Sequence, residues 1–278
     1  MPAIELSPRP VERIWGRTDL PPPFDGLAGD RGPIGEIWFE APGEPEPELL
    51  VKYLFTSDVL SVQVHPDDGQ ARRRGLRSGK DEAWLILDAE PGATIGMGLV
   101  REIGREELRA AALSGGIERL LDRRAVRRGE ILYSPAGTIH AIGAGLSLIE
   151  IQQNCDVTYR LYDHGRGREL HLNEAVSVAR PAPYVPPPAP AAPGDGREVH
   201  VAGGNFVLER WTGARTVPLG GAGAGAILLI PVIDSGSVDG RPLRAGSVWT
   251  VEGQAELELS AAADLLIAYS GGEVRDFA

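Results

Sequence analysis

Short apolar runs separated by turn residues dominate the chain from residue 49 onward. Because runs of this length rich in Val, Ile, Leu and aromatic residues are typical of strands, the pattern predicts a mostly β protein. The runs in the first half are LLVKYLF, VLSVQVH, AWLILDA, ATIGMGL, GEILYSP and LSLIEIQQ, and those in the second half are NFVLERW, AILLIPVI, GSVWTVE, AELELS and DLLIAY. Residues 1–50 are rich in Pro and Gly, so we expect irregular cover there plus one strand near Ile34 to Glu40.

Two segments of helical composition interrupt the strands. In residues 102–121 (EIGREELRAAALSGGIERLL) the Ser-Gly-Gly at 114–116 should divide the segment into two short helices. The sequence LNEAVSVA after His171 predicts one more. Many strands with so few helices fit two small β-barrels or sandwiches better than an alternating β-α-β arrangement.

A proline-rich run, PAPYVPPPAPAAPGDG at 181–196, separates the two groups of strands. Proline fixes φ and removes a backbone donor, so this run predicts an extended, semi-rigid linker. An alternative is a loop that packs along the surface of a single domain. We therefore predict a first domain over 1–180, a linker over 181–196 and a second domain over 197–278.

Composition narrows the classes of function. The net charge of −11 disfavours non-specific nucleic-acid binding, although a local cationic pocket can still receive an anionic substrate. The N-terminal residues lack the basic and apolar regions of a secretory signal, and no apolar run is long enough to span a membrane. A single cysteine, Cys155, cannot form an internal disulfide. We expect a cytoplasmic protein without membrane or nucleic-acid partners.

Lysine is rare in this chain. Of 28 Lys and Arg residues, only Lys52 and Lys80 are lysines. Where arginine is the usual cation, a retained lysine suggests a place that requires a compact ammonium group. The alternative is that sequence drift left the two lysines at arbitrary positions.

Four residues form a candidate metal shell. Alternation in VLSVQVH places Gln63 and His65 on one strand face, Glu82 precedes an apolar strand, and a Pro-x-Gly turn presents His140. Two imidazoles, a carboxylate and an amide oxygen suit a borderline divalent ion. Each of these residues alone would fit a surface position equally well, so only the four together favour a metal site.

The stretch Gly129-x5-Pro135-x-Gly137-x2-His140 resembles the second motif of the cupin superfamily. LLVKYLFTSDVLSVQVHPDD, GKDEAW, PAGTIHAIGAGLSLIEIQ and DVTYRLYDHGR, in that order, resemble the short bacterial form of the type I mannose-6-phosphate isomerases. The resemblance implies an all-β dominated fold with two cupin-like β-barrel (jelly-roll) halves and a small helical insert. It also implies one zinc ion held by Gln63, His65, Glu82 and His140, and a sugar-phosphate substrate.

Further roles follow from the same resemblance. Lys80 and Arg160 are expected to bind substrate and stabilise transition-state charge, Lys52 to contact the substrate or support the metal site, and Glu150 to take part in acid–base chemistry. Asp81, His140 and a metal-bound water are other candidates for the proton-transfer base. Alternatively, Arg160 pairs with Asp163 on the surface and Glu150 points outward. His164, His171 and His200 are taken as ordinary residues, and Trp15, Trp38 and Trp84 as core or pocket wall.

The second half carries no copy of the metal motif, because no histidine follows Gly246 in GSVWTVEGQ. We expect that half to be structural. Two other functions remain open: a different metal-dependent cupin enzyme, such as a dioxygenase or another sugar isomerase, and a non-catalytic sugar-binding or regulatory cupin. The oligomeric state is not indicated by the sequence.

Overall fold

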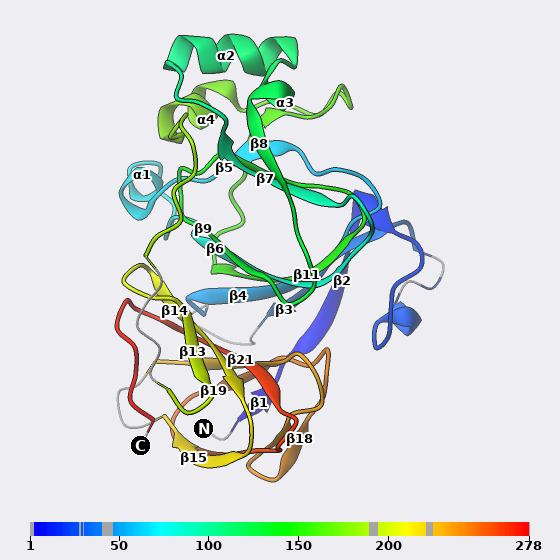
Figure 1. The fold of residues 1–278 in the computed structure, drawn as a ribbon, viewed down its shortest axis with the longest axis vertical. Coiled ribbons are helices and arrows are strands. Elements are labelled where there is room, and N and C mark those ends of the chain that lie inside the picture. The colour runs from blue at the N-terminus through cyan, green and yellow to red at the C-terminus, as the bar shows by residue number, and fades with distance from the viewer. Residues whose placement is uncertain are drawn as a thin grey trace.

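The computed structural model describes residues 3–27, 29, 31–40, 47–188, 194–220 and 225–277. Its strands form four sheets, which lie one above another with three helices at one end of the stack (Figure 1). We number the sheets from the helical end. Sheet I has the order β12-β5-β10-β7-β8, sheet II β2-β3-β4-β11-β6-β9, sheet III β1-β19-β16-β21-β14-β13 and sheet IV β15-β20-β17-β18. The all-β fold with two two-sheet halves is confirmed.

The first half contributes sheets I and II. Their strands are β2 (Ser7–Arg17), β3 (Ile34–Glu40), β4 (Leu49–Phe55), β5 (Val62–Val64), β6 (Glu82–Ala89), β7 (Thr94–Leu99), β8 (Leu121–Ala125), β9 (Ile131–Ser134), β10 (His140–Ile142), β11 (Leu146–Gln153) and β12 (Tyr159–Tyr162). The helices are α1 (Asp68–Arg72), α2 (Arg105–Ser114), α3 (Ile117–Leu120) and α4 (Leu172–Val178), with a 3-10 turn at Asp25–Leu27. The predicted division of 102–121 into two helices and the helix after His171 are confirmed.

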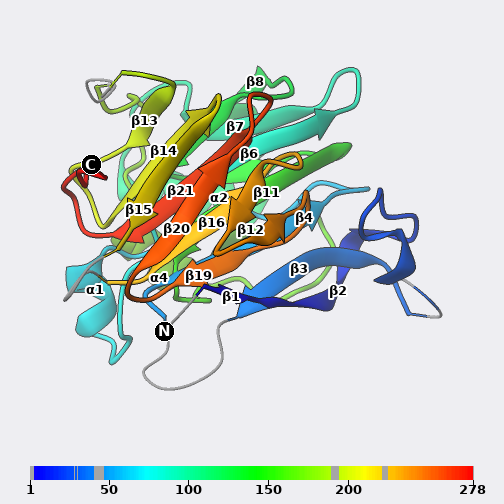
Figure 2. The same ribbon diagram turned by 90° about the horizontal axis from the view of Figure 1, so that it is seen from below.

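The second half contains only strands among the described residues, as predicted. They are β13 (Arg197–Val201), β14 (Phe206–Thr212), β15 (Arg215–Leu219), β16 (Ile227–Pro231), β17 (Gly236–Val238), β18 (Arg241–Leu243), β19 (Trp249–Val251), β20 (Ala255–Leu259) and β21 (Asp264–Ser270). The remaining strand of sheet III, β1 (Ile4–Glu5), comes from the N-terminus and pairs with β19 (Figure 2).

Sheet II is covered on both faces, which explains the uninterrupted apolar run in β4. Val51 and Tyr53 pack in a core that sheets II and III share, together with Phe206 and Leu266 of the second half. Alternate residues of the same strand, such as Lys52, point into the first half. The two halves are therefore joined by a common apolar layer rather than by a linker alone.

One expectation about an irregular segment is wrong. Residues 7–17 form an eleven-residue strand rather than irregular cover. β2 is the edge strand of sheet II, where Pro8 and Pro10 need not donate to a further strand. The described part of the proline-rich run packs along the first half, since Ala182 O accepts from Leu99 N at 3.0 Å and Tyr184 Oη donates to Tyr133 O at 2.6 Å.

Residues 189–193 of the predicted linker lie outside the described residues. Within the part of the chain that the structure describes, no helix is both long and apolar enough to cross a membrane.

Candidate active site

Two rows of cross-strand neighbours meet inside the first half. One row crosses sheet II through Trp38, Lys52, Glu150 and Trp84. The other crosses sheet I through Arg160, Gln63 and His140. The ring centroids of Trp84 and His140 are 5.3 Å apart, which brings the two rows into contact. Strand register alone therefore gathers five predicted site residues, because neighbours on paired strands have Cβ atoms about 5 Å apart.

Strand alternation adds the other three predicted residues. Glu82 lies two residues before Trp84 on β6, and Lys80 lies two residues before Glu82. His65 follows the end of β5, two residues after Gln63. Side chains two positions apart share a face of a strand, so each of these groups points toward the same interior.

A buried cluster of potential metal ligands lies between the rows. One ligand atom each of His65, Glu82 and His140 lies within 4.8 Å of the others. The two carboxylate oxygens of Glu82 are each 3.4 Å from an imidazole Nε2, Oε1 from that of His65 and Oε2 from that of His140. This separation is long for a hydrogen bond, but it is about the ligand spacing around a tetrahedral ion with bonds of about 2.1 Å.

The hydrogen bonds of the cluster leave the potential ligand atoms unpartnered. His65 Nδ1 is 2.8 Å from Val157 O and His140 Nδ1 is 3.0 Å from Thr138 O, so each Nδ1–H donates to a backbone carbonyl. Among the described residues, the buried Nε2 atoms of both histidines and Oε2 of Glu82 have no hydrogen-bond partner. Unpartnered buried polar atoms are costly, and a cation would satisfy all three. The residues therefore fit a divalent metal.

The protonation states also suit a metal. Burial lowers the pKa of His140 to about 4 and lowers that of His65, so both imidazoles are neutral at pH 7. Burial opposes the ionisation of Glu82, but the positive charge of Lys80 holds the pKa of this carboxyl well below its usual range. Neutral imidazoles and an ionised carboxylate are the forms that ligate a metal ion.

Lys80 is buried beside the cluster, with Nζ 2.8 Å from Glu82 Oε1. Burial alone would lower the pKa of its ammonium group, but the carboxylates of Glu82 and Glu150 raise the pKa above its usual value. Lys80 therefore places a fixed positive charge next to the candidate metal centre.

Glu150 is buried and does not point outward, which contradicts the alternative stated from the sequence. Its Oε1 accepts from Trp84 Nε1 at 3.0 Å, and its Oε2 is 4.0 Å from Lys52 Nζ. Burial and the charge of Glu82 raise the pKa of Glu150 to about 7, against the opposing effect of the two lysines. This carboxyl can thus exchange a proton near neutral pH.

The raised pKa of Glu150 predicts a pH-dependent gain in stability for Glu150→Gln in the metal-free protein. A carboxyl whose pKa rises on folding binds more protons when folded, so stability falls as pH rises from about 4.5 to 7. Glutamine removes this loss and can still accept from Trp84. We expect Glu150→Gln to be more stable than wild type by on the order of 2 kcal/mol at pH 8, with little gain at pH 4.5. Thermal unfolding of chelator-treated protein measures this difference.

The exposed Glu90 provides a matched control, because Glu90→Gln makes the same chemical change outside the site. An equal response of the two variants between pH 4.5 and 8 would refute the environment assigned to Glu150.

A cavity of about 360 Å³ opens beside the cluster. Its lining includes the predicted residues Lys52, Gln63, Lys80, Glu82, Glu150 and Arg160, with Trp15 in the wall. Arg160 is partly buried and donates to Glu169 O at 2.7 Å, whereas Asp163 pairs with Arg166 and Arg168. The proposed surface pair of Arg160 with Asp163 is therefore not formed.

Two further cationic residues that were not predicted from the sequence, Arg13 and Arg168, line this cavity. Arg13 donates to Glu36 at 2.6 Å. In a chain where arginine is the common surface cation, neither residue carries a distinguishing signal. Only the folded arrangement shows that both line the cavity.

Lys52, which lines the cavity, packs against the ring of Trp38. Lys52 Nζ lies 4.1 Å from the centroid of the Trp38 ring and 3.2 Å from Asp156 Oδ1. A lysine that is almost fully buried needs such partners. The contacts with the Trp38 ring and Asp156 therefore stabilise the buried ammonium group of Lys52.

The remaining histidines lie outside the candidate metal cluster. His164 contacts Glu118 at 2.6 Å, His171 accepts from the backbone N of Arg160 at 3.2 Å, and His200 is 3.6 Å from Glu198. Asp81, a candidate base, points to the opposite side of its strand from Lys80 and Glu82, where it accepts from Tyr133 at 2.8 Å. Its carboxylate is not placed to transfer a proton in the cavity.

Comparison with known proteins identifies the family. The chain is 33% identical over 211 residues to the probable mannose-6-phosphate isomerase GmuF of Bacillus subtilis. This alignment covers 62% of this chain and 67% of that relative. It is 41% identical over 136 residues to mannose-6-phosphate isomerase of Streptococcus mutans, covering 47% of this chain and 43% of that relative. The chain belongs to the mannose-6-phosphate isomerase family.

Solved structures of mannose-6-phosphate isomerases share the fold. That of the Bacillus subtilis enzyme matches with a TM-score of 0.81 and 26% identity, over 97% of this chain and all of that chain. A variant of phosphomannose isomerase from Salmonella typhimurium matches with a TM-score of 0.72 and 14% identity over 97% of this chain, which shows the fold alone. No family model matches the chain. The chain spans less than half the length of the Streptococcus mutans relative.

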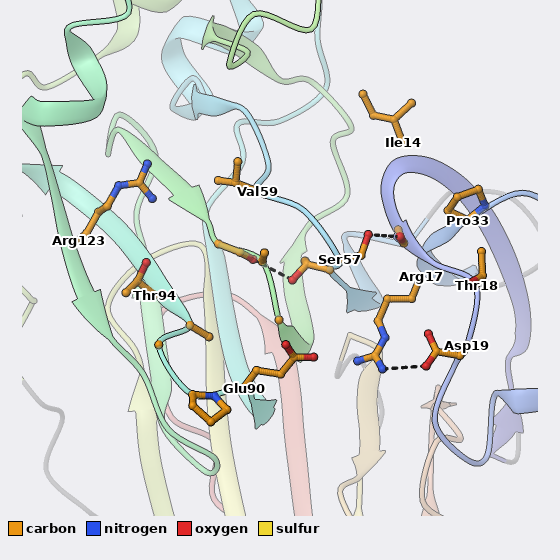
Figure 3. Close-up of a pocket in the computed structure, with 18 residues that line it drawn as sticks. Ile14, Arg17, Thr18, Asp19, Pro33, Ser57, Val59, Glu90, Thr94 and Arg123 are labelled. Carbon is orange, nitrogen blue, oxygen red and sulfur yellow. Dashed lines mark hydrogen bonds and ion pairs between the residues drawn. The ribbon is translucent and has the colours of Figure 1, made fainter.

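A wider groove of about 740 Å³ lies elsewhere on the first half of this isomerase-family chain (Figure 3). It is lined by Ile14 and Gly16, which alternate along β2 with the cavity residues Arg13 and Trp15. Of its charged residues, Arg17 and Asp19 come from one segment and Glu90 and Arg123 from two others (Figure 3), and Arg17 is 3.5 Å from Asp19. None of the eight predicted site residues lines this groove, so size alone does not mark the site.

Proposed function

We propose that this chain interconverts mannose 6-phosphate and fructose 6-phosphate, with one zinc ion held by Gln63, His65, Glu82 and His140. The observation that carries the proposal is the set of three unpartnered ligand atoms at a cavity lined by Lys80, Glu150 and Arg160. Zinc suits two neutral imidazoles with oxygen ligands. Gln63 is the direct cross-strand neighbour of His140, which supports its amide oxygen as the fourth ligand.

The reaction moves a proton between two adjacent carbons and builds negative charge on their oxygens. When bound, the ion supplies positive charge that stabilises these oxygens and orients the sugar. Lys80 adds a fixed ammonium beside the ion. Arg160, on the neighbouring strand to Gln63, holds either the developing charge or the phosphate.

Glu150 is the group in the cavity best suited to move the proton. Its Oε1 is held by Trp84, while Oε2 faces Lys52 across 4.0 Å. A buried carboxyl that lines the cavity can accept a proton from one carbon and return it to the other. Lys52 holds the orientation of this carboxyl and offers a second cation to the substrate.

The non-catalytic alternative would be favoured if Lys80 or Arg160 pointed away from the candidate metal cluster. Both line the cavity, and Lys80 contacts a candidate ligand directly. A dioxygenase would favour additional imidazole ligands, whereas the fourth candidate here is an amide. These features support an isomerase over the alternatives.

We also propose that residues 1–180 carry the catalytic site, that 181–196 connect the halves and that 197–278 form the second unit, with β1 exchanged into it. A cytoplasmic location is proposed from the single cysteine, and a small sugar phosphate is the proposed partner.

Metal removal tests the proposal. Purified protein should interconvert the two sugar phosphates, lose activity on treatment with a chelator and regain it with zinc. The coupled assay of fructose 6-phosphate formation measures each step. Turnover that survives complete removal of bound metal would contradict the metal-dependent mechanism, and a zinc-loaded protein without turnover would favour the binding function.

A further inference from the structure

Asp81 is a buried carboxylate between two site residues, but it points away from the cavity. Its Oδ1 accepts from Ala136 N at 2.7 Å, and its Oδ2 accepts from Tyr133 Oη at 2.8 Å and from Asn205 Nδ2 at 2.9 Å. Three donors on one carboxylate fix its position. Because Lys80 and Glu82 flank Asp81 on the chain, their backbone is fixed with it.

The same carboxylate joins the segments that carry the candidate ligands. Ala136 belongs to the turn that leads to His140, and the next residue, Gly137, donates its N–H to His65 O at 2.8 Å. Lys80 N donates to Pro66 O at 3.0 Å. The segments holding His65, Glu82 and His140 therefore meet at a small set of hydrogen bonds with Asp81 at its centre.

Asn205 is the contribution of the second half to this network. It precedes β14 of sheet III, and its Nδ2 donates to Asp81 Oδ2 at 2.9 Å and lies 3.2 Å from Gln153 Oε1. Gln153 also contacts the backbone of Asp81, accepting from its N–H at 3.0 Å. The neighbouring Gly204 approaches closely, since a Cβ there would lie 3.0 Å from Tyr133 Oη.

We propose that Asn205 is a positioning residue for the metal site, acting through Asp81 on the Lys80–Glu82 segment. This inference rests on the proposed metal-dependent function. It revises the expectation that the second half is only structural, because that half donates a hydrogen bond to the segment that carries Glu82. Residues that orient metal ligands typically change metal affinity by about 10- to 100-fold when mutated. Asn205 contacts Asp81 and not a metal ligand itself, so we expect a change in zinc affinity at the lower end of this range.

The experiment compares zinc affinity by chelator competition in three variants. Asn205→Ala should weaken zinc binding about tenfold. Asn205→Asp keeps the volume but removes the donor and places a second carboxylate against Asp81, so its affinity should fall further. In both variants kcat should fall at saturating zinc more than KM rises, because the displaced Lys80–Glu82 segment stabilises the charge that develops on the substrate oxygens during the reaction.

Arg210→Ala is the matched control. Arg210 also connects the halves, donating to Gly129 O at 3.2 Å, but it does not contact Asp81. It should change zinc affinity by less than about twofold while lowering the unfolding temperature at least as much as Asn205→Ala. An unchanged zinc affinity in Asn205→Ala, or an equal loss in Arg210→Ala, would overturn the inference.

The two proposals fail in different ways. Wild-type protein that binds zinc without isomerising the sugar phosphates would contradict the proposed activity and leave the positioning result intact. Wild-type protein that binds no zinc would refute both.

Discussion

His140→Ala should lower zinc affinity about 100-fold or more and leave only a trace of isomerase activity. Binding of zinc by four protein ligands contributes about 10–16 kcal/mol, so one ligand accounts for roughly 3 kcal/mol, or two powers of ten. His140 is fully buried and its Nε2 is one of the unpartnered atoms of the cluster. Zinc stoichiometry and competition with a chromogenic chelator measure the loss.

Two further variants separate coordination from packing. His140→Gln keeps a side-chain oxygen and much of the volume, so its zinc affinity should lie between those of wild type and His140→Ala. His200→Ala removes a half-buried histidine of the second half and should leave zinc affinity unchanged. Full zinc occupancy in His140→Ala at the wild-type dissociation constant would place the metal elsewhere.

Much of the site could be predicted from local sequence because strand alternation is a local property. Gln63 and His65, or Lys80 and Glu82, share a face whatever the partner strands are. The two lysines are informative for a physical reason that the structure makes clear. Lys52 and Lys80 are both buried, each beside a carboxylate, whereas the abundant arginines mostly remain at the surface.

Other features depend on contacts between distant segments and carry no local signal. The burial of Glu150 follows from its central place in sheet II, between Lys52 on β4 and Trp84 on β6. The strand β2 was missed because two prolines argue against a strand, and only its place at a sheet edge permits them. The contact between Asn205 and Asp81 joins residues 124 positions apart.

The four-sheet arrangement gives the second half, whose sequence carries no copy of the metal motif, a role in supporting the site. Sheet II supplies site residues from one face and packs on sheet III with the other. Leu85 and Ile149, for example, lie in the shared core, while their neighbours Trp84 and Glu150 point into the first half, where Glu150 lines the cavity. Removal of the second half would expose that apolar face, so the site depends on sheet III even though sheet III provides no ligand.

Glu150→Gln should retain zinc and lose about 10²- to 10⁴-fold in kcat, the usual contribution of a positioned acid–base group. Glutamine keeps the shape of the side chain and can still accept from Trp84, but it cannot accept the migrating proton. Since Lys80 and the ligands are untouched, KM and zinc affinity should change little. Single-turnover kinetics with deuterium at the transferred position should show the chemical step becoming fully rate-limiting.

Glu209→Gln is the matched control for this variant. Glu209 is a fully buried carboxylate that also accepts from an indole N–H, that of Trp211 at 2.8 Å, but it lies in the second half, remote from the cavity. Its substitution should leave kcat per folded molecule unchanged.

Two results for Glu150→Gln would contradict its role as the proton-transfer group. If the variant kept wild-type kcat, the proton would have to move through another group. If it lost zinc together with activity, Glu150 would serve the metal site rather than proton transfer. The same substitution is expected to stabilise the metal-free protein at alkaline pH. A variant that loses activity and gains stability would show that the buried carboxylate destabilises the fold and is needed for catalysis.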